Sequence, residues 1–355
     1  DEAGFEVLGD VAANIVAAVK QGEQKSRGRP VIDLSIGIAM SDGSAASIAR
    51  LYTQADAAAF AAKEAMGSNV VTYDAKLKSA ILRKTNVETR LRTALTRGDI
   101  NIAFQPQFRL KGAEMIGFEA LARWSDPKLG IVGPDEFVGV AEESALIHDF
   151  DRMIARKSLK SAALWLAKNQ TISINVSGHT VVSADYCRFL IQEIANSGLS
   201  PQQVEIEITE TALIENWETC RRNIDRMRKE GIRIVLDDFG IGYSSLSYLS
   251  QFPVQKIKFD RTFLLQCRSA SNTKVMHTIV QLAKVLDVEV IAEGVETNRH
   301  VALLKHIGCP YAQGYLFAKP IAATKMHEFF RSRAVKTLLD ASDTGTFEPI
   351  ENMVA

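Results

Sequence analysis

The sequence predicts an α/β protein whose larger part is a (β/α)8 barrel of the TIM type with one antiparallel strand. Eight apolar segments between residues 101 and 317 have the length of strands, and helical segments alternate with most of them. Repeated strand–helix units over ~230 residues fit a doubly wound sheet or a closed barrel, and the strand number and length favour the barrel. A short turn at Lys111-Gly112 joins the first two strands, so one strand should run antiparallel to its neighbours.

The expected elements of the barrel follow the apolar pattern along the chain. The strands are 101–108, 114–124, 172–177, 204–209, 233–238, 256–260, 289–293 and 312–317. The helices between them include 134–147, 149–168, 183–197, 217–230, 271–287 and 297–306. Residues 99–335 therefore form the predicted barrel domain, and the polar segment 336–355 is predicted to be a flexible tail.

Residues 1–74 are predicted to form a separate, small α+β unit. Its expected strands are Phe5–Leu8, 31–39 and 69–73, and its expected helices are 11–19 and 47–66. Residues 75–98 are charged and carry apolar residues at helical spacing, so we interpret them as a connecting helix. The C-terminal half of this segment can equally well be the first helix of the barrel domain.

The composition is that of a soluble globular protein without a polymer partner. Hydrophobic residues make up 46% of the chain, and 42 basic residues balance 42 acidic ones, which argues against a nucleic acid polymer as a partner. The four cysteines are far apart and form no Cys/His cluster, which argues against zinc and favours a reducing cytoplasm. No segment approaches the ~20 apolar residues of a membrane helix.

Six of the apolar segments each present a polar residue that can bind a metal. A carboxylate within a strand of Ile and Val is costly to bury unless a positive charge compensates it, and six in series indicate a common charged point at one end of a barrel. The residues are Glu119, Asn175, Glu207, Asp237 with Asp238, Asp260 and Glu293. Donors that are all oxygen atoms favour Mg²⁺ or Mn²⁺ over zinc. Adjacent carboxylates such as Asp237 and Asp238 can hold two metals, which together clamp a phosphoryl displacement.

Further polar residues accompany this group. Lys258 shares a strand face with Asp260, where it would hold the attacking water or serve only as a charge partner. Arg123, four residues after Glu119, would bind a phosphate or else lie on the surface. After the double aspartate, a segment rich in small residues predicts a mobile loop that closes on the metal centre. Its members are Gly240, Gly242, Ser244 and Ser245.

These segments resemble the EAL family of bacterial cyclic-di-GMP phosphodiesterases, from about Val87 to Arg331. Glu119-Ala120-Leu121 matches the family signature, and Asp237–Leu246 matches its double aspartate and catalytic loop. The other matching segments are Phe104-Gln105-Pro106, Asn175-Val176-Ser177, Glu207–Glu210, Lys258-Phe259-Asp260, Glu293–Glu296 and Gln313-Gly314-Tyr315. No acidic residue of the family pattern is missing, although Ile241 replaces a frequent threonine and Gly178-His179 is unusual.

The resemblance implies metal-dependent hydrolysis of cyclic di-GMP to linear pGpG, with two Mg²⁺ or Mn²⁺ ions per site. It implies Glu119, Asn175, Glu207 and Asp237 on one metal, Asp237 and Asp238 on the other, and Glu293 as a further ligand. Lys258 would orient the nucleophile, so the expected catalytic residues are Lys258, Glu293 and Glu119. The predicted substrate-binding residues are Gln105, Leu121, Arg123, Asp260 and Gln313. The residues expected to position the loop are Glu210 and Glu296, together with Gly240, Gly242, Ser244 and Ser245.

Residues 1–74 resemble the C-terminal half of a GGDEF, or diguanylate cyclase, domain. Ser35–Ala39 and Ala55–Ala65 carry this likeness, and Asp1–Gly4 do not match the Gly-Gly-Asp-Glu signature. We therefore expect no cyclase activity and a regulatory role, with GTP as a candidate ligand. The resemblance also implies a homodimer through the barrel and a place in the bacterial cytoplasm, where a segment outside this chain can tether the full-length protein to the inner membrane.

A binding module is the main alternative to an enzyme. Such a receptor would hold cyclic di-GMP without cutting it and signal to a protein partner. It should have lost metal ligands, and none is missing here. A scaffold with vestigial domains is a third reading, which predicts that no nucleotide binds.

Overall fold

The computed structural model describes residues 2–24, 33–41, 48–64, 69–210, 217–239, 253–266 and 270–332. The chain separates into two compact units, Asp1–Thr89 and Arg90–Ala355, and the division falls within helix α3 (Ala75–Arg97). The predicted loop residues Gly240, Gly242, Ser244 and Ser245 lie outside the described ranges, as does the predicted tail 336–355. None of the helices in the described ranges combines the length and the hydropathy that crossing a membrane requires.

In the first unit, the described residues form a two-stranded parallel sheet and helices that pack on it. The elements are α1 (Glu2–Gln24), β1 (Ser35–Ile38), α2 (Ile48–Glu64) and β2 (Asn69–Thr72). Helix α2 packs on both strands and buries Ala58 and Ala62. Gly37 permits this close approach, because a Cβ atom there would lie 2.1 Å from the carbonyl oxygen of Ala55.

The predicted strand Phe5–Leu8 is wrong, because these residues belong to α1. Leu8, Ala12 and Ile15 continue the spacing of three to four residues of the Ala-rich segment that follows, so the whole stretch is one helix. Two strands, rather than the expected three, are therefore present in the described part of this unit.

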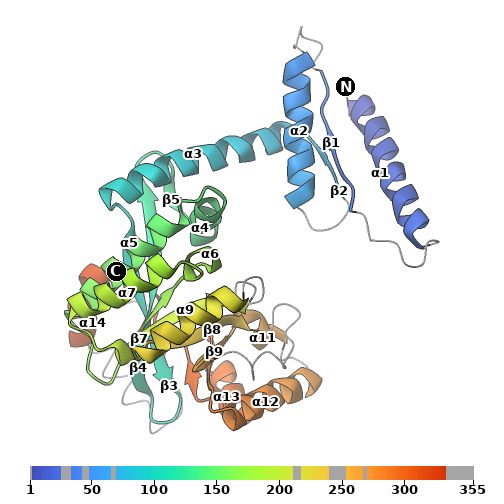
Figure 1. Cartoon of the computed structure of the whole chain (residues 1–355). Coiled ribbons are helices and arrows are strands. Elements are labelled where there is room, and N and C mark those ends of the chain that lie inside the picture. The colour runs from blue at the N-terminus through green and yellow to red at the C-terminus, as the bar shows by residue number, and fades with distance from the viewer. Residues whose placement is uncertain are drawn as a thin grey trace. The chain divides into compact units, whose positions relative to one another are not determined.

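In the second unit, eight strands in the described ranges close into the predicted barrel (Figure 1). Hydrogen bonds link them in the order β3-β11-β10-β9-β8-β7-β6-β4 and back to β3. Strand β3 pairs antiparallel with β4 and β11, whereas the remaining pairs in the ring are parallel, which confirms the expected single antiparallel strand. The bounds are β3 (Asn101–Arg109), β4 (Glu114–Asp126), β6 (Thr171–Asn175), β7 (Val204–Thr209), β8 (Arg233–Phe239), β9 (Lys256–Phe259), β10 (Glu289–Ala292) and β11 (Tyr311–Ala312).

Two short strands that the sequence did not predict extend the barrel sheet. Strand β5 (Gly130–Val132) pairs with the end of β4, and β12 (Ile321–Ala322) pairs with β3. Strand β11 is shorter than the expected 312–317, because the chain turns after it and Phe317 donates its backbone N–H to Gly314.

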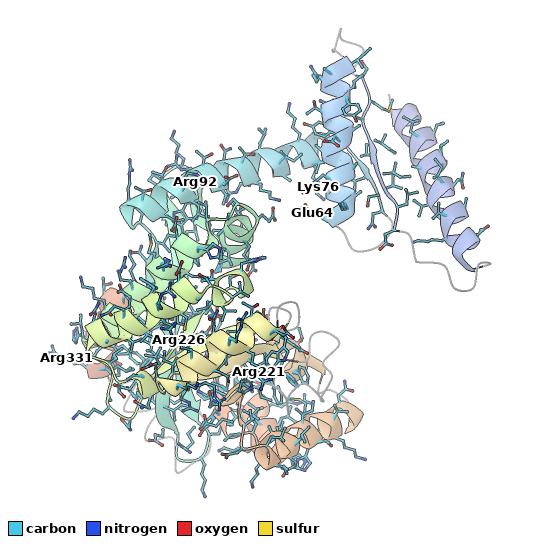
Figure 2. All side chains as sticks on the ribbon, in the orientation of Figure 1. Glu64, Lys76, Arg92, Arg221, Arg226 and Arg331 are labelled. Carbon is cyan, nitrogen blue, oxygen red and sulfur yellow. The ribbon has the colours of Figure 1, made fainter. Side chains whose placement is uncertain are left out.

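The helices of this unit cover the outside of the barrel (Figure 1). They are α4 (Pro134–Glu143), α5 (Ile147–Ala162), α6 (Gly178–Val181), α7 (Ala184–Ser197), α9 (Trp217–Lys229), α11 (Arg261–Gln266), α12 (Ala270–Val285), α13 (Asn298–Ile307), α14 (Met326–Arg331) and the 3-10 helices η1 (Pro201–Gln203) and η2 (Ala323–Lys325). Helix α9 illustrates the pattern: Cys220, Ile224 and Met227 are buried at helical spacing, while Arg221 points to solvent (Figure 2).

The strands of the barrel are buried on both faces, and some of their inward residues are charged. Strand β9 reads Lys256-Ile257-Lys258-Phe259, and all four residues are buried. In β7, Glu205 and Glu207 alternate with apolar residues in the same way. Alternation therefore places two acids and two lysines inside the barrel, in successive layers.

Candidate functional site

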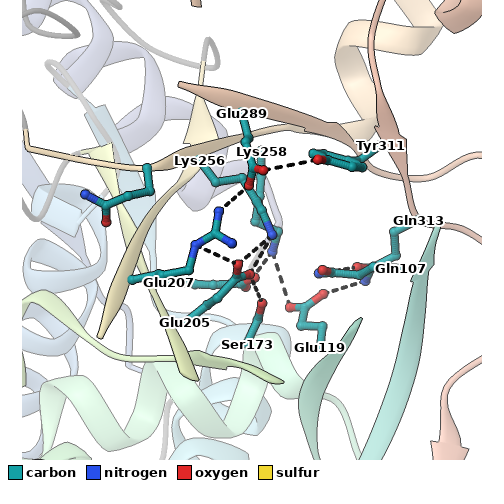
Figure 3. A network of polar contacts seen from close by, with 12 residues as sticks. Gln107, Glu119, Ser173, Glu205, Glu207, Lys256, Lys258, Glu289, Tyr311 and Gln313 are labelled. Atoms are coloured by element: carbon teal, nitrogen blue, oxygen red, sulfur yellow. Dashed lines mark hydrogen bonds and ion pairs between the residues drawn. The ribbon is translucent and has the colours of Figure 1, made fainter. Parts of the chain in front are cut away.

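Four carboxylates converge on the ammonium group of Lys258 inside the barrel. Its Nζ atom lies 2.6 Å from Glu207 Oε2 and 2.6 Å from Glu293 Oε1. Asp237 Oδ2 follows at 3.3 Å and Glu119 Oε1 at 3.4 Å. These acids come from β4, β7, β8 and the residue after β10, so the predicted convergence of distant segments is present. Figure 3 shows two of them, Glu119 and Glu207, beside Lys258.

Asn175 and Asp238 complete the predicted set of metal-binding residues. Asn175, the last residue of β6, donates from Nδ2 to Glu119 Oε1 at 2.8 Å. Asp238 follows Asp237 at an irregularity where the pairing of β8 with β9 skips from Leu236 to Phe239. Its φ of 55° is left-handed, which is uncommon for a residue other than glycine. Bulges of this kind redirect side chains, and here both neighbouring aspartates line one cavity at the ends of the parallel strands.

The charges of this cluster are strongly coupled. Burial alone would raise the pKa of Glu119, but the charge of Lys258 and the hydrogen bonds from Gln313 and Asn175 outweigh it and lower that pKa. Burial and the negative charge of Glu119 hold the pKa of Glu207 well above its usual range. Burial also raises the pKa of Glu293 to about 8. One lysine therefore cannot keep all the surrounding carboxylates ionised, and the cluster has a deficit of positive charge.

A divalent cation fits this deficit. Glu207 Oε1 is buried and has no hydrogen-bond partner within the described residues. The donors are carboxylate and amide oxygens, which are ligands of hard cations such as Mg²⁺ and Mn²⁺. In the described part of the chain, however, no three acidic, histidine or cysteine side chains stand in an arrangement ready for a metal, because the carboxylates close on Lys258. The residue types fit a cation, and binding would require the carboxylates to turn from the lysine.

A row of buried glutamines supports Glu119 from behind (Figure 3). Gln313 Nε2 donates to Glu119 Oε2 and to Gln105 Oε1, the latter at 3.0 Å. Gln107 Nε2 donates to Gln313 Oε1 at 3.0 Å. This bond fixes the orientation of the Gln313 amide, so that its NH₂ group rather than its oxygen faces the carboxylate. Gln107 was missed in the sequence, although it shares the inward face of β3 with Gln105, two residues away.

A second ion-pair network fills the next layer of the barrel, toward the beginnings of the strands (Figure 3). Lys256 Nζ lies 2.6 Å from Glu205 Oε2, and Ser173 donates to the same oxygen at 2.8 Å. Arg233 bridges Glu205 and Glu289. Glu205 is fully buried, and Lys256 and Arg233 outweigh the burial and lower its pKa. Cations of the chain itself thus pair with the acids of this layer.

A cavity of about 440 Å³ adjoins the acid cluster at the ends of the parallel strands. Leu121 and Arg123, both predicted to contact the substrate, line it together with Asn175, Glu207 and Asp237. Concave sites at this end of a barrel are where the loops that follow the strands assemble catalytic centres.

The family model for the EAL domain matches residues 88–320. The chain belongs to the EAL-domain family. Cyclic di-GMP phosphodiesterase NbdA of Pseudomonas aeruginosa is 30% identical over 306 residues, which cover 85% of this chain and 39% of NbdA. The chain spans about half, or less, of the length of the curated relatives it matches.

Solved structures of EAL proteins share this fold. The EAL enzyme Bd1971, with cAMP and cyclic di-GMP bound, superposes with a TM-score of 0.66 at 29% identity, over 70% of this chain and 69% of that one. BlrP1 of Klebsiella pneumoniae, in a complex with manganese and cyclic di-GMP, gives a TM-score of 0.57 at 28% identity, over 63% of this chain and 56% of that one.

Several predicted residues of the EAL domain lie beside the cavity rather than in its wall. Gln105 and Gln313 are buried behind Glu119, and their contact with a substrate stays a prediction. Asp260 accepts the backbone N–H of Thr262 at 2.7 Å, at the start of α11. Glu296 pairs with Arg261 at 3.0 Å.

Glu210 is buried just after β7, and its predicted contact with the loop involves residues outside the described ranges. The roles of Asp260, Glu296 and Glu210 in substrate binding and loop positioning likewise stay predictions.

The wall of the cavity also contains an unpredicted buried acid, Asp151 of α5. Its Oδ2 atom accepts the backbone N–H of Ser177, and burial raises its pKa to about 7. Ser177 in turn donates its hydroxyl to Glu142 at 2.7 Å. The sequence contained one signal for this residue: Asp151 lies between Phe150 and Ile154, on the face of the helix that the apolar pattern predicts to be buried.

Proposed function

We propose that this EAL domain hydrolyses one phosphodiester bond of cyclic di-GMP and releases linear pGpG. The observation that carries the proposal is the convergence of Glu119, Glu207, Asp237 and Glu293 around Lys258, beside a cavity with Arg123 in its wall. The similarity to NbdA supports the choice of substrate, and the manganese and cyclic di-GMP complex of BlrP1 supports divalent cations as cofactors.

The residues that would hold two Mg²⁺ or Mn²⁺ ions are Glu119, Asn175, Glu207, Asp237, Asp238 and Glu293. When bound, such ions lower the pKa of water and offset charge that develops on a phosphoryl group. Burial alone would lower the pKa of Lys258, but the charges of Asp237, Glu119 and the other acids outweigh it and raise that pKa well above the usual range. The ammonium group therefore stays protonated and can donate a hydrogen bond to the attacking water. Glu293, 2.6 Å from that ammonium, offers an oxygen for the proton that the water loses.

The substrate needs groups that hold its phosphates in line. Arg123 reaches the cavity from β4 and would fork onto a phosphate, and Leu121 would pack against the dinucleotide. Water adds to one phosphorus atom, the P–O3′ bond breaks, and the leaving 3′ oxygen gains a proton as the water loses one. The product is the linear dinucleotide pGpG.

Incubation of the purified chain with cyclic di-GMP and either Mg²⁺ or Mn²⁺, followed by chromatography of the nucleotides, tests the proposal. We expect pGpG to accumulate with time, and at least ~100-fold more slowly with Glu119→Gln as the matched control. The absence of pGpG with both metals would refute the hydrolase.

A receptor that binds cyclic di-GMP without cutting it is the second candidate. The observation that favours it is the closure of the carboxylates on Lys258, which leaves no described group of three ready for a metal. Calorimetry with the same protein separates the two: saturable binding of cyclic di-GMP without turnover supports the receptor.

We also propose that residues 1–74 form a GGDEF-like regulatory unit, 75–98 a connecting helix and 99–335 the phosphodiesterase. The parallel pair β1–β2 with α2 packed on it supports a small α+β unit before α3. Turnover measured with and without GTP tests regulation, and light scattering tests the proposed homodimer. A bacterial cytoplasmic location remains our expectation.

A further inference from the structure

Asn175, one of the proposed metal ligands, has few contacts of its own. It is the last residue of β6 and is exposed. Its Nδ2 atom donates to Glu119 Oε1 at 2.8 Å, and within the described residues its Oδ1 atom forms no hydrogen bond. An amide oxygen is the atom that a hard cation would bind. The position of this oxygen therefore depends on the chain segment that follows β6.

Two acids on two helices bind that segment at Ser177. Asp151 of α5 accepts the backbone N–H of Ser177 at 3.1 Å, and Glu142 of α4 accepts its hydroxyl at 2.7 Å. The preceding backbone N–H, that of Val176, donates to the carbonyl oxygen of Glu207 at 3.0 Å. The chain thus leaves the barrel sheet after Val176 and contacts the helical layer at Ser177.

The contact with Asp151 is buried, whereas Glu142 is exposed. Asp151 is 3% exposed, and the buried side chain of Thr180 interacts with the same carboxyl. His148 in turn lies with its Nδ1 atom 3.1 Å from the hydroxyl oxygen of Thr180. A satisfied polar network in the interior is rigid, while a hydrogen bond at the surface competes with water. Asp151 is therefore the contact that fixes the position of Ser177.

A purely structural role for Asp151 would be to stabilise the short helix α6, which begins after Ser177. The other end of that helix offers a direct comparison. Asn223 of α9 is 7% exposed and donates from Nδ2 to the carbonyl oxygen of Val181, the last residue of α6, at 2.8 Å. Both side chains satisfy a backbone group at one end of α6, but Asp151 does so two residues from Asn175.

We propose that Asp151 is a positioning residue, which acts through the backbone of Ser177 to hold Asn175 where its amide oxygen can bind a cation at the acid cluster. Groups that orient a metal ligand from outside typically change metal affinity by roughly 10–100-fold. The inference rests on the proposed metal site, because Asn175 enters it as a ligand.

Calorimetry of the full chain with Mn²⁺, well below the unfolding temperature, tests this role. Asp151→Leu removes the acceptor and should weaken Mn²⁺ binding about 10-fold. Asp151→Asn keeps an oxygen for the N–H of Ser177 and should bind Mn²⁺ within roughly 2-fold of the wild type. Asn223→Leu is the matched control. It removes a buried hydrogen bond at the other end of α6 and should bind Mn²⁺ as the wild type does.

Turnover of cyclic di-GMP separates a role through the metal ligand from contact with the nucleotide, since Asp151 also lines the cavity. Asp151→Leu should be slower than the wild type at low Mn²⁺ and should regain most of its rate as Mn²⁺ is raised. Its KM for cyclic di-GMP at saturating Mn²⁺ should match that of the wild type. A raised KM combined with wild-type affinity for Mn²⁺ would make Asp151 a nucleotide contact and overturn the proposal.

Thermal unfolding in EDTA checks that each variant is folded. Asp151→Ala, which also lacks the acceptor, replaces Asp151→Leu if the latter does not fold. Wild-type Mn²⁺ affinity without the acceptor, an equal loss in Asn223→Leu, or an equal loss in Asp151→Asn would each overturn the positioning role and leave the hydrolase intact. A wild-type chain that binds no Mn²⁺ would refute the metal site and the positioning role together.

Discussion

Replacing Lys258 by methionine tests whether the acid cluster is built for a cation. The substitution keeps the volume of the side chain but removes the ammonium group that, within the described residues, lies among Glu119, Glu207, Asp237 and Glu293, whose oxygens are within 3.4 Å of it. Removing one partner of a buried ion pair costs ~3–5 kcal/mol. In a domain of this size, that loss lowers the midpoint of thermal unfolding by about 6–20 °C.

A divalent cation should reverse much of this loss. A ligand at 100 times its dissociation constant stabilises the folded state by ~2.7 kcal/mol, and the variant should bind it more tightly than the wild type because no ammonium competes. We would measure unfolding by circular dichroism in EDTA and in a series of Mn²⁺ concentrations. The midpoint of Lys258→Met should rise more with Mn²⁺ than that of the wild type.

Lys256→Met is the matched control for this experiment. Lys256 is equally buried two residues earlier on β9, and its partner Glu205 keeps Arg233 at 3.4 Å after the substitution. We expect this variant to be destabilised as well, but to gain no more from Mn²⁺ than the wild type does. An equal gain in both variants, or none in Lys258→Met, would show that the four acids do not form a cation site.

Three further outcomes follow from the site. Glu119→Gln and Asp237→Asn should each reduce turnover of cyclic di-GMP at least ~100-fold while the unfolding midpoint stays within a few degrees, and near-full activity in either would contradict the ligand assignment. Gln107→Leu frees the amide of Gln313 to rotate and should weaken Mn²⁺ binding by calorimetry about 10-fold; unchanged affinity would remove Gln107 from the support of Glu119. Burial raises the pKa of Asp151 from 3.8 to about 7, so this carboxyl stabilises the fold below pH 4 and loses that contribution as the pH rises through 7. Asp151→Asn should therefore unfold at higher urea than the wild type at pH 8 and show a smaller advantage at pH 5, and an advantage that does not shrink at pH 5 would argue against a buried, protonated acid.

The barrel was predictable because its strands and helices have distinct periods and the Lys111-Gly112 turn is too short for a crossover. The helical state of Phe5–Leu8 was not, since a run of four residues fits either period and only the register with Ala12 and Ile15 decides for a helix over the predicted strand. Strands β5 and β12 contain three and two residues, too few for any periodic signal.

The acids of the cluster were predictable because a carboxylate in a strand of Ile and Val is an expensive exception. The identity of their partner was harder to infer, since Lys258 is 139 positions from Glu119 in the chain and the pairing depends on barrel closure. Gln107 was hard to single out, because an uncharged amide in a buried strand is tolerated and its role depends on Gln313, the residue after β11, which the fold brings next to it. Asp151 was not predicted for a similar reason, because a single acid does not break the amphipathic pattern of a helix.

The two lysines of β9 also protect the alignment of that strand. A shift of the pairing by one residue would place both ammonium groups against the apolar inner face of the helices. It would also place Ile257 and Phe259 inside the barrel, next to Glu205 and Glu207. Two buried cations and two buried anions would then lack partners, and the misaligned sheet would be much less stable than the native one. The buried charges inside the barrel thus fix the register of β9 during folding, independently of any role in binding a nucleotide.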